Sequence, residues 1–263
     1  MAIEIGEDGR TFTLLTERTE YQLRADERGV LQHVWYGART GCDMSYLLEF
    51  PDVGFSGNVY DAGDCRAYSL DTLPLEYSCR GAGDYRLAAV AAEHAHGGNA
   101  LDLRFAGYEV RRGKYALPGL PHAEAGEEDA QTLQIVLRDA SGVTVTLLYG
   151  VFAHCDVITR CARIENGADA PVYLTAAHSL CLDTPHGDWE QICFDGRHTM
   201  ERVPSRAPLA YGVRESASDR GISSHQHNPA VILCEKRCDE SRGACIGAAL
   251  MYSGAFEIRT ERT

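Results

Sequence analysis

The sequence predicts an all-β protein built from antiparallel strands. Apolar and polar residues alternate with a period of two over much of the chain, which is the pattern of half-buried strands. Turn-forming residues recur about every 8–12 residues, as an antiparallel sandwich or barrel requires. A single segment, Leu87–Ala95, favours a helix by its alanine content.

The first expected strands are short and are separated by charged turns. They cover Thr11–Thr16, Tyr21–Ala25 and Val30–Tyr36. Leu87–Ala95 lies between glycine-rich turns and other strands, so we expect a strand there, because pairing in a sheet can override helix propensity. Leu101–Phe105 alternates apolar and polar residues and is also expected to be a strand.

Two hairpins are expected in the middle of the chain. Thr132–Arg138 and Val143–Tyr149 each place apolar residues on one face, and an Asp-Ala-Ser-Gly turn joins them. Val157–Glu165 and Val172–Ser179 are joined by an Asn-Gly-Ala-Asp-Ala-Pro turn. We therefore expect each pair of runs to form an antiparallel hairpin.

The pattern shows no boundary between domains, so residues 1–263 are expected to form a single domain. The expected long loops are Glu49–Asp64, which is rich in glycine and aspartate, and Leu117–Asp129, which is rich in proline and then acidic. Phe256–Thr263 has the pattern of a strand that runs to the last residue. We expect the chain to be a fragment of a longer protein that stops before the last strands of its domain.

Composition and charge exclude several classes of function. Of the 263 residues, 44% are hydrophobic and 24% are charged, and the formal net charge is −13. An acidic surface repels nucleic acid and anionic membranes, so neither is expected as a partner. No apolar run approaches the roughly 20 residues that span a bilayer, and Met1–Arg10 lacks the apolar stretch of a signal peptide. We expect a soluble, cytoplasmic protein.

The metal-ligating residue types occur without the spacing of a metal site. Ten cysteines are spread along the chain, and Cys234, Cys238 and Cys245 have the wrong spacing for a zinc site. His225 and His227 share one face of an extended segment, but no third ligand follows. The glycine motifs that bind nucleotides are also absent from the sequence. We expect reduced structural thiols, no metal and no cofactor.

The candidate binding residues are concentrated in the first third of the chain. Phe50–Ser56 leads through a Gly/Asp-rich segment to Asp64–Arg66, and Ser69–Tyr77 and Gly81–Arg86 follow. Carboxylate and guanidinium groups hydrogen-bond sugar hydroxyls in defined directions, and aromatic faces cover the apolar side of a sugar ring. Loops of this composition on a β-sandwich indicate a sugar site.

Five segments, in order along almost the whole chain, resemble the N-terminal domain of the family 36 glycoside hydrolases, the bacterial α-galactosidases. The segments are Ser69–Arg86, Arg111–Ala123, Asp156–Val172, Ser218–Pro229 and Leu250–Phe256. The resemblance implies a large antiparallel β-supersandwich of the galactose-mutarotase type with few short helices. It also implies that a (β/α)8 barrel and a small β domain follow in the whole protein.

The resemblance implies a retaining α-galactosidase that acts on terminal α-galactosides of the melibiose or raffinose type. In the family both catalytic aspartates belong to the barrel, the nucleophile within a Lys-Trp-Asp-type motif that does not occur in these 263 residues. The chain is therefore expected to contain no catalytic residue and to be inactive alone. It is expected to pack on its own barrel and to support a homo-oligomer.

The resemblance also implies which residues contact the sugar. Asp52 and Arg66 match the aspartate and arginine that this domain lends to galactose binding, although they could instead pair with each other in a surface loop. Glu76, Asp84 and Arg86 are expected to form a buried polar network that shapes the loops, because buried charges are paired.

Two other functions remain open from the sequence. A stand-alone sugar epimerase of the galactose-mutarotase type needs a histidine acid and a glutamate base. His178 is the candidate acid, but no glutamate stands out as the base. The other alternative is a carbohydrate-binding module without catalytic activity.

Overall fold

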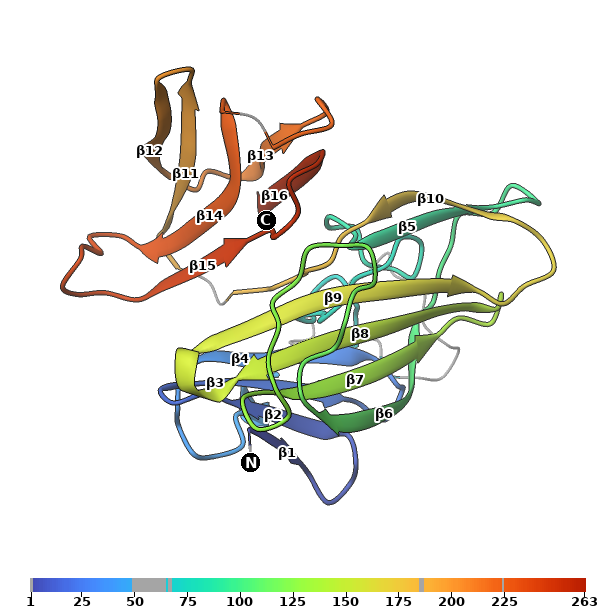
Figure 1. The fold of residues 1–263 in the computed structure, drawn as a ribbon. Coiled ribbons are helices and arrows are strands. Elements are labelled where there is room, and N and C mark those ends of the chain that lie inside the picture. The colour runs from blue at the N-terminus through green and yellow to red at the C-terminus, as the bar shows by residue number, and fades with distance from the viewer. Residues whose placement is uncertain (1, 49–64, 66–67, 185–186, 224) are drawn as a thin grey trace. The chain divides into compact units, whose positions relative to one another are not determined.

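The computed structural model describes residues 2–48, 65, 68–184, 187–223 and 225–263. Within them the fold is all-β, with antiparallel sheets and two short 3-10 helices, Ser45–Leu47 and Ala153–Cys155, as the sequence predicts (Figure 1). The chain divides into two compact units. The first is Met1–Ala116 with Ala123–Thr184, and the second is Leu117–His122 with Pro185–Thr263. That residues 1–263 act as one domain stays a prediction.

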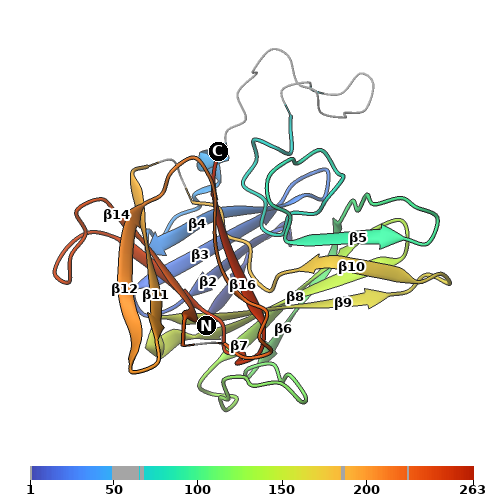
Figure 2. The same cartoon turned by 90° about the horizontal axis from the view of Figure 1, so that it is seen from above.

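The first unit contains two four-stranded sheets and one two-stranded sheet. The sheet orders are β1-β2-β3-β4, β6-β7-β8-β9 and β10-β5, and Figure 2 shows β5 and β10 side by side. The strands are β1 (Ile3–Ile5), β2 (Thr11–Leu15), β3 (Thr19–Ala25), β4 (Leu31–Ala38), β5 (Val90–His94), β6 (Arg104–Arg112), β7 (Gln131–Arg138), β8 (Val143–Phe152), β9 (Val157–Asn166) and β10 (Val172–Ala177).

The core of the first unit follows from the period of two. Alternate apolar residues of β2, β3, β7 and β8 point to one side and form a single buried cluster with β5 and with residues 101–103. β8 is the most buried strand, since it lies between β7 and β9 in its sheet. The fully buried large side chains in this cluster include Phe12, Leu14, Leu23, Leu133, Ile135, Leu147 and Tyr149.

Most of the expected strands of this unit are confirmed, and so is the first hairpin. β7 pairs with β8 in the register Arg138↔Thr144. At the turn, the Gly142 N–H donates to the Asp139 carbonyl at 3.1 Å, and the φ of Gly142 is +97°. A side chain is rarely tolerated at this φ, so glycine suits the turn. Leu87–Ala95 also contains a strand, β5, and no helix.

Two strand predictions are corrected. Val157–Glu165 and Val172–Ser179 do not form a hairpin, because β9 pairs with β8 whereas β10 pairs with β5. The turn residues between them indicated a reversal of the chain but not the partner strand. Leu101–Phe105 is a strand only from Arg104 onward. Its leucines are buried as the alternation predicts, but the Leu101 N–H donates to the Arg80 carbonyl at 2.9 Å instead of to a sheet.

The expected loops have different outcomes. Leu117–Asp129 contains no strand or helix and is confirmed as a loop. Glu49–Asp64 lies outside the described residues.

The second unit consists of a four-stranded sheet in the order β12-β11-β14-β15 and a two-stranded sheet, β13-β16. The strand expected over Phe256–Thr263 is confirmed as β16. Within the described part of the chain, no helix has the length and hydropathy that crossing a bilayer needs. The strands are β11 (Trp189–Arg197), β12 (Met200–Pro208), β13 (Gly212–Ser218), β14 (His227–Glu235), β15 (Cys245–Ala249) and β16 (Phe256–Arg262).

Candidate functional site

The two residues expected to contact sugar, Asp52 and Arg66, lie outside the described residues. The chain that follows them is anchored at Tyr68, two residues after Arg66. The Tyr68 hydroxyl donates to Asp26 Oδ2 at 2.5 Å, and the Arg28 guanidinium lies 4.2 Å from the centroid of the Tyr68 ring. Asp26 and Arg28 belong to the turn between β3 and β4. This end of the candidate sugar loop is therefore fixed to the first sheet.

Residues 68–89, which we call the anchored loop, are held together by Arg86. The guanidinium donates to the carbonyls of Leu70 at 3.0 Å and Leu73 at 2.6 Å. It also donates to Asp84 Oδ1 at 2.9 Å and to Asp183 Oδ2 at 3.1 Å. One side chain thus joins three parts of the anchored loop to the segment that follows β10.

Two nearby carboxylates, Asp84 and Asp183, compensate the positive charge of Arg86. Burial opposes the charge on Arg86, but Asp84 and Asp183 outweigh burial and raise the pKa of the guanidinium. Burial raises the pKa of the Asp183 carboxyl, and Arg86 offsets this only in part. Hydrogen bonds of this charged kind are shorter and stronger than neutral ones, so they suit a loop without regular secondary structure.

Glu76 is the centre of a second buried group, which we call the Glu76 cluster. Its side chain is fully buried. The Tyr21 hydroxyl donates to Glu76 Oε2 at 2.7 Å, and the Tyr149 hydroxyl donates to Oε1 at 2.8 Å. Arg160 Nη1 lies 2.7 Å from Oε1, and His33 Nδ1 lies 3.5 Å from Oε2. The cluster joins β3, β4, β8 and β9 to the anchored loop.

The Glu76 cluster keeps its carboxylate ionised inside the protein. Burial acts to raise the pKa of Glu76, but Arg160, His33 and the Tyr21 hydroxyl together lower it below its usual value. Burial, together with the nearby carboxylate, raises the pKa of both Tyr21 and Tyr149 well above the ordinary range. A buried carboxylate with these partners stabilises local structure only while its cation is present.

The structure places the three expected network residues in two neighbouring groups. Asp84 and Arg86 form a direct ion pair, whereas Glu76 pairs with Arg160. Sequence reasoning did not identify Arg160, yet a signal was present. Ile158, Ala162 and Ile164 alternate on the core side of β9, and Arg160 is the charged residue on that same side. It lies directly opposite Tyr149 of β8.

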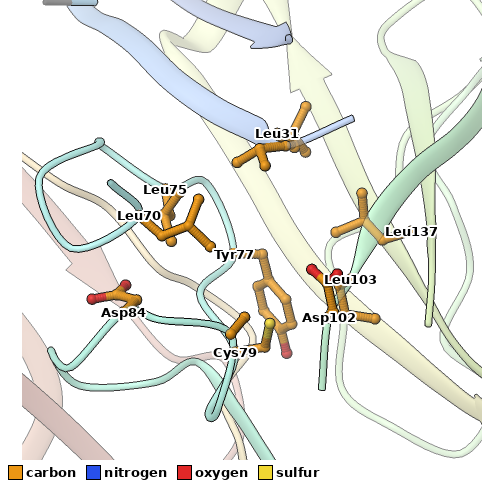
Figure 3. A pocket seen from close by; sticks show the side chains of 11 residues that line it. Leu31, Leu70, Leu75, Tyr77, Cys79, Asp84, Asp102, Leu103 and Leu137 are labelled. Carbon is orange, nitrogen blue, oxygen red and sulfur yellow. The ribbon is translucent and has the colours of Figure 1, made fainter. Parts of the chain in front are cut away.

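A small cavity lies beside the anchored loop. It has a volume of about 20 Å³ and is bordered by apolar residues that include Leu31, Leu75 and Leu137, with Asp84 and Asp102 at its edge (Figure 3). This volume holds about one water molecule. Ligand pockets measure roughly 300–1,000 Å³, so a sugar does not fit this cavity.

The first unit also has an open groove of about 560 Å³. Its charged lining includes Glu17, Arg39, Arg112 and the acidic run Glu127–Asp129. Its described lining contains no phenylalanine, tyrosine or tryptophan that could cover a sugar ring. The groove therefore offers carboxylate and guanidinium partners for hydroxyl groups, but its described lining has no aromatic face for a sugar ring.

The histidines and cysteines singled out from the sequence do not form a ligand cluster in the described part of the chain. Within the ranges that the structure describes, no group of three or more potential metal ligands occurs. His227 Nδ1 lies 3.0 Å from Asp195 Oδ1, and none of the ten cysteines, all of which are described, forms a disulfide. His178 contributes backbone groups, since its carbonyl accepts a hydrogen bond from the Tyr77 hydroxyl at 2.7 Å.

Comparison with known proteins assigns the family. The family model for the glycosyl hydrolase family 36 N-terminal domain matches residues 29–263. The bifunctional α-galactosidase/sucrose kinase AgaSK of Mediterraneibacter gnavus is 46% identical over 263 residues, which is 100% of this chain and 28% of that protein. The α-galactosidase AgaA of Geobacillus stearothermophilus is 37% identical and shares 99% of this chain and 36% of its own.

Solved structures agree with the sequence match. The galactosidase domain of AgaSK superposes with a TM-score of 0.96 at 46% identity, covering 100% of this chain and 37% of that one. The family 36 α-galactosidase AgaB of Geobacillus stearothermophilus gives 0.92 at 34% identity, covering 99% of this chain and 36% of its own. The chain spans about a third of the length of these relatives. It belongs to the N-terminal domain family of the family 36 glycoside hydrolases.

Proposed function

We propose that this chain is the N-terminal part of a retaining α-galactosidase that acts on terminal α-galactosides of the melibiose and raffinose type. The observation that carries the proposal is the 46% identity to an α-galactosidase over the whole chain. A variant of AgaA from Geobacillus stearothermophilus, 35% identical to this chain, has been solved in complex with raffinose. These relationships favour the α-galactosidase over a stand-alone epimerase.

The bond-breaking groups are proposed to lie elsewhere in the whole protein. Retaining glycosidases need two carboxyl groups about 5–5.5 Å apart, one as nucleophile and one as acid/base. The buried carboxylates described above are instead committed to arginines, Glu76 to Arg160 and Asp84 to Arg86. On this proposal the chain alone does not hydrolyse the substrate.

The proposed role of this chain in substrate binding falls to Asp52 and Arg66. A carboxylate and a guanidinium are directional partners for hydroxyl groups, so they would distinguish the axial hydroxyl of galactose from the equatorial one of glucose. Tyr68, just after Arg66, is fixed by Asp26 and Arg28. Such anchoring supports a loop that has to hold two charged groups in place.

Glu76, Asp84 and Arg86 are proposed to shape the loops around this site. Arg86 restrains the anchored loop through the carbonyls of Leu70 and Leu73. Glu76 attaches the same loop to β3 and β8 through Tyr21 and Tyr149. The contacts of Arg86 and of the Glu76 cluster would thus restrain the anchored loop, which follows Arg66 in the chain.

The expected partners and location complete the proposal. The chain packs on its own catalytic barrel, the whole enzyme is a homo-oligomer, and it works in the cytoplasm. The absence of disulfides among the ten cysteines is compatible with a reducing compartment. Light scattering coupled to size exclusion would measure the oligomer, and a monomeric whole enzyme would contradict that part of the proposal.

The site is tested in the whole enzyme with the substitutions Asp52→Ala and Arg66→Ala. Each removes a charged hydrogen bond to the sugar, so kcat/KM for a chromogenic α-galactoside should fall about tenfold or more. Asp169→Ala and Arg163→Ala remove charges of the same kind from exposed positions and should leave kcat/KM unchanged. Unchanged kinetics for both Asp52→Ala and Arg66→Ala would remove the assignment.

A further inference from the structure

Three cysteines of the second unit gather at one end of the β14–β15 hairpin. Cys234 is next to the last residue of β14, and Cys245 is the first residue of β15. The two are direct partners across the strands. Cys238 lies in the connection between them. The family assignment gives these thiols no role.

The hydrogen-bond pattern fixes the geometry of the Cys234–Cys245 pair. The Glu235 N–H donates to the Ala244 carbonyl at 3.0 Å, and at the other end the Leu250 N–H donates to the Pro229 carbonyl at 2.8 Å. The register between these bonds has no shift. Hydrogen-bonded pairs alternate with non-hydrogen-bonded pairs along antiparallel strands, so Cys234 and Cys245 form a non-hydrogen-bonded pair.

A non-hydrogen-bonded pair brings two cysteines within bonding range. Its Cα atoms are about 4.5 Å apart, and both side chains leave the same face of the sheet. Disulfides join Cα atoms separated by about 4.4–6.8 Å. The two strands therefore need little movement for the sulfur atoms of Cys234 and Cys245 to bond.

The two thiols differ in their exposure. Cys245 is exposed, whereas Cys234 is 1% exposed and its Sγ lies 3.6 Å from the Glu190 carbonyl. Burial raises the pKa of the Cys234 thiol. An oxidant in solution therefore meets Cys245 first, and Cys234 is placed to react with the product.

We propose that Cys234 and Cys245 form a reversible disulfide when the protein meets a peroxide. Hydrogen peroxide oxidises the Cys245 thiol to a sulfenic acid and is itself reduced to water. The Cys234 sulfur then attacks the Cys245 sulfur, the S–S bond forms, and the sulfenic hydroxyl leaves as a second water with the thiol proton. A dithiol reductant reverses the reaction by thiol–disulfide exchange.

Cys238 is not the direct cross-strand partner of either residue. It follows Arg237, whose φ is +69°, and the pairing that resumes at Asp239↔Arg242 is shifted relative to β14 and β15. Its Cα lies against Gly243, where an added Cβ would come within 2.9 Å. Cys238 thus lies opposite Gly243 across the turn. After burial, nearby Cys245 also raises the pKa of the Cys238 thiol, so Cys238 is the competing partner that the test has to separate.

The disulfide would secure an edge strand. β15 is at the end of the sheet order β12-β11-β14-β15, and its described hydrogen-bonded neighbour is β14. A covalent link at the first residue of β15 would keep this edge paired when the hairpin opens locally. The proposed consequence is a second unit whose edge is more resistant to opening under oxidising conditions.

Trypsin separates the three cysteines, which gives a direct test. Cleavage after lysine and arginine places Cys234 on residues 221–236, Cys238 on 238–242 and Cys245 on 243–259. The native protein is treated with hydrogen peroxide, alkylated, unfolded, digested and examined by mass spectrometry without reductant. We expect residues 221–236 joined to 243–259 as the dominant cross-linked species, and its loss after dithiothreitol.

Matched variants separate the pairing from general oxidation. Cys238→Ser should retain the joined peptide, and Cys245→Ser should lose it while melting at the same temperature as the reduced parent protein. The proposal is overturned if 238–242 is the peptide that becomes cross-linked. It is equally overturned if Cys245 is over-oxidised to sulfinic or sulfonic acid without a cross-link, or if both thiols stay reduced.

Discussion

The two compact units bury their strands to very different extents. In the first unit, β8 is buried along almost its whole length, and Leu147 is 1% exposed. In the second unit, β12 is exposed on both faces, and Val203 is 46% exposed. Both clusters of buried apolar residues found in the described chain belong to the first unit. Burial of apolar side chains therefore stabilises β8 and its sheet in the first unit far more than it stabilises β12 in the second unit.

A second contrast concerns how each unit holds its polar groups. In the first unit a glutamate and an arginine are buried together with two tyrosines. The ion pairs described in the second unit are exposed, such as Arg259 with Glu215, or partly exposed, such as Arg206 with Glu190. Buried pairs are costly to break, whereas exposed pairs contribute little. Removing one charge from the buried pair of the first unit should thus lower the free energy of unfolding strongly. Removing one charge from an exposed pair of the second unit should change it little.

The largest expected effect comes from Arg160→Met in the Glu76 cluster. The substitution leaves the Glu76 carboxylate buried without its cation, which should lower the free energy of unfolding by about 3–5 kcal/mol. Urea denaturation at neutral pH measures it. Arg163→Met on the same strand removes an exposed partner of Glu165 and should cost roughly 0–1 kcal/mol. Equal effects of the two substitutions would mean that the buried cluster does not stabilise the fold.

A smaller effect is expected from truncating one apolar side chain in each unit. Leu147→Ala opens a cavity in the core of the first unit and should cost about 2–5 kcal/mol. Val203→Ala removes an exposed side chain from β12 and should change the free energy of unfolding by no more than about 0.5 kcal/mol. Chemical denaturation of both variants compares them. A large loss for Val203→Ala would show that β12 is covered in solution.

The same contrast explains which strands the sequence predicts. The hairpin of β7 and β8 is predictable because alternating apolar residues on both sides of a short turn allow one register. β12 lacks this signal, since a strand exposed on both faces needs no alternation. The partner of β10 could not be predicted from its turn residues, because a turn indicates that the chain reverses, whereas β10 pairs with β5, a strand distant in sequence.

The candidate site is predictable only in part. The resemblance identifies Asp84 and Arg86, which are close in sequence and form a direct pair. The partners of Glu76 are distant, since Tyr21 is 55 residues away and Tyr149 is 73 residues away. Contacts between residues so far apart cannot be predicted from a local sequence pattern, because they form only when β3, β8 and β9 come together in the fold.

The most direct measurement concerns the purified 263-residue chain and a chromogenic α-galactoside. If the chain supplies sugar contacts and loop scaffolding while the catalytic carboxyl groups lie elsewhere in the whole protein, the rate should equal that of buffer alone. The whole enzyme, assayed in parallel, should hydrolyse the same substrate. Turnover by the isolated chain that persists through repeated purification would contradict the account.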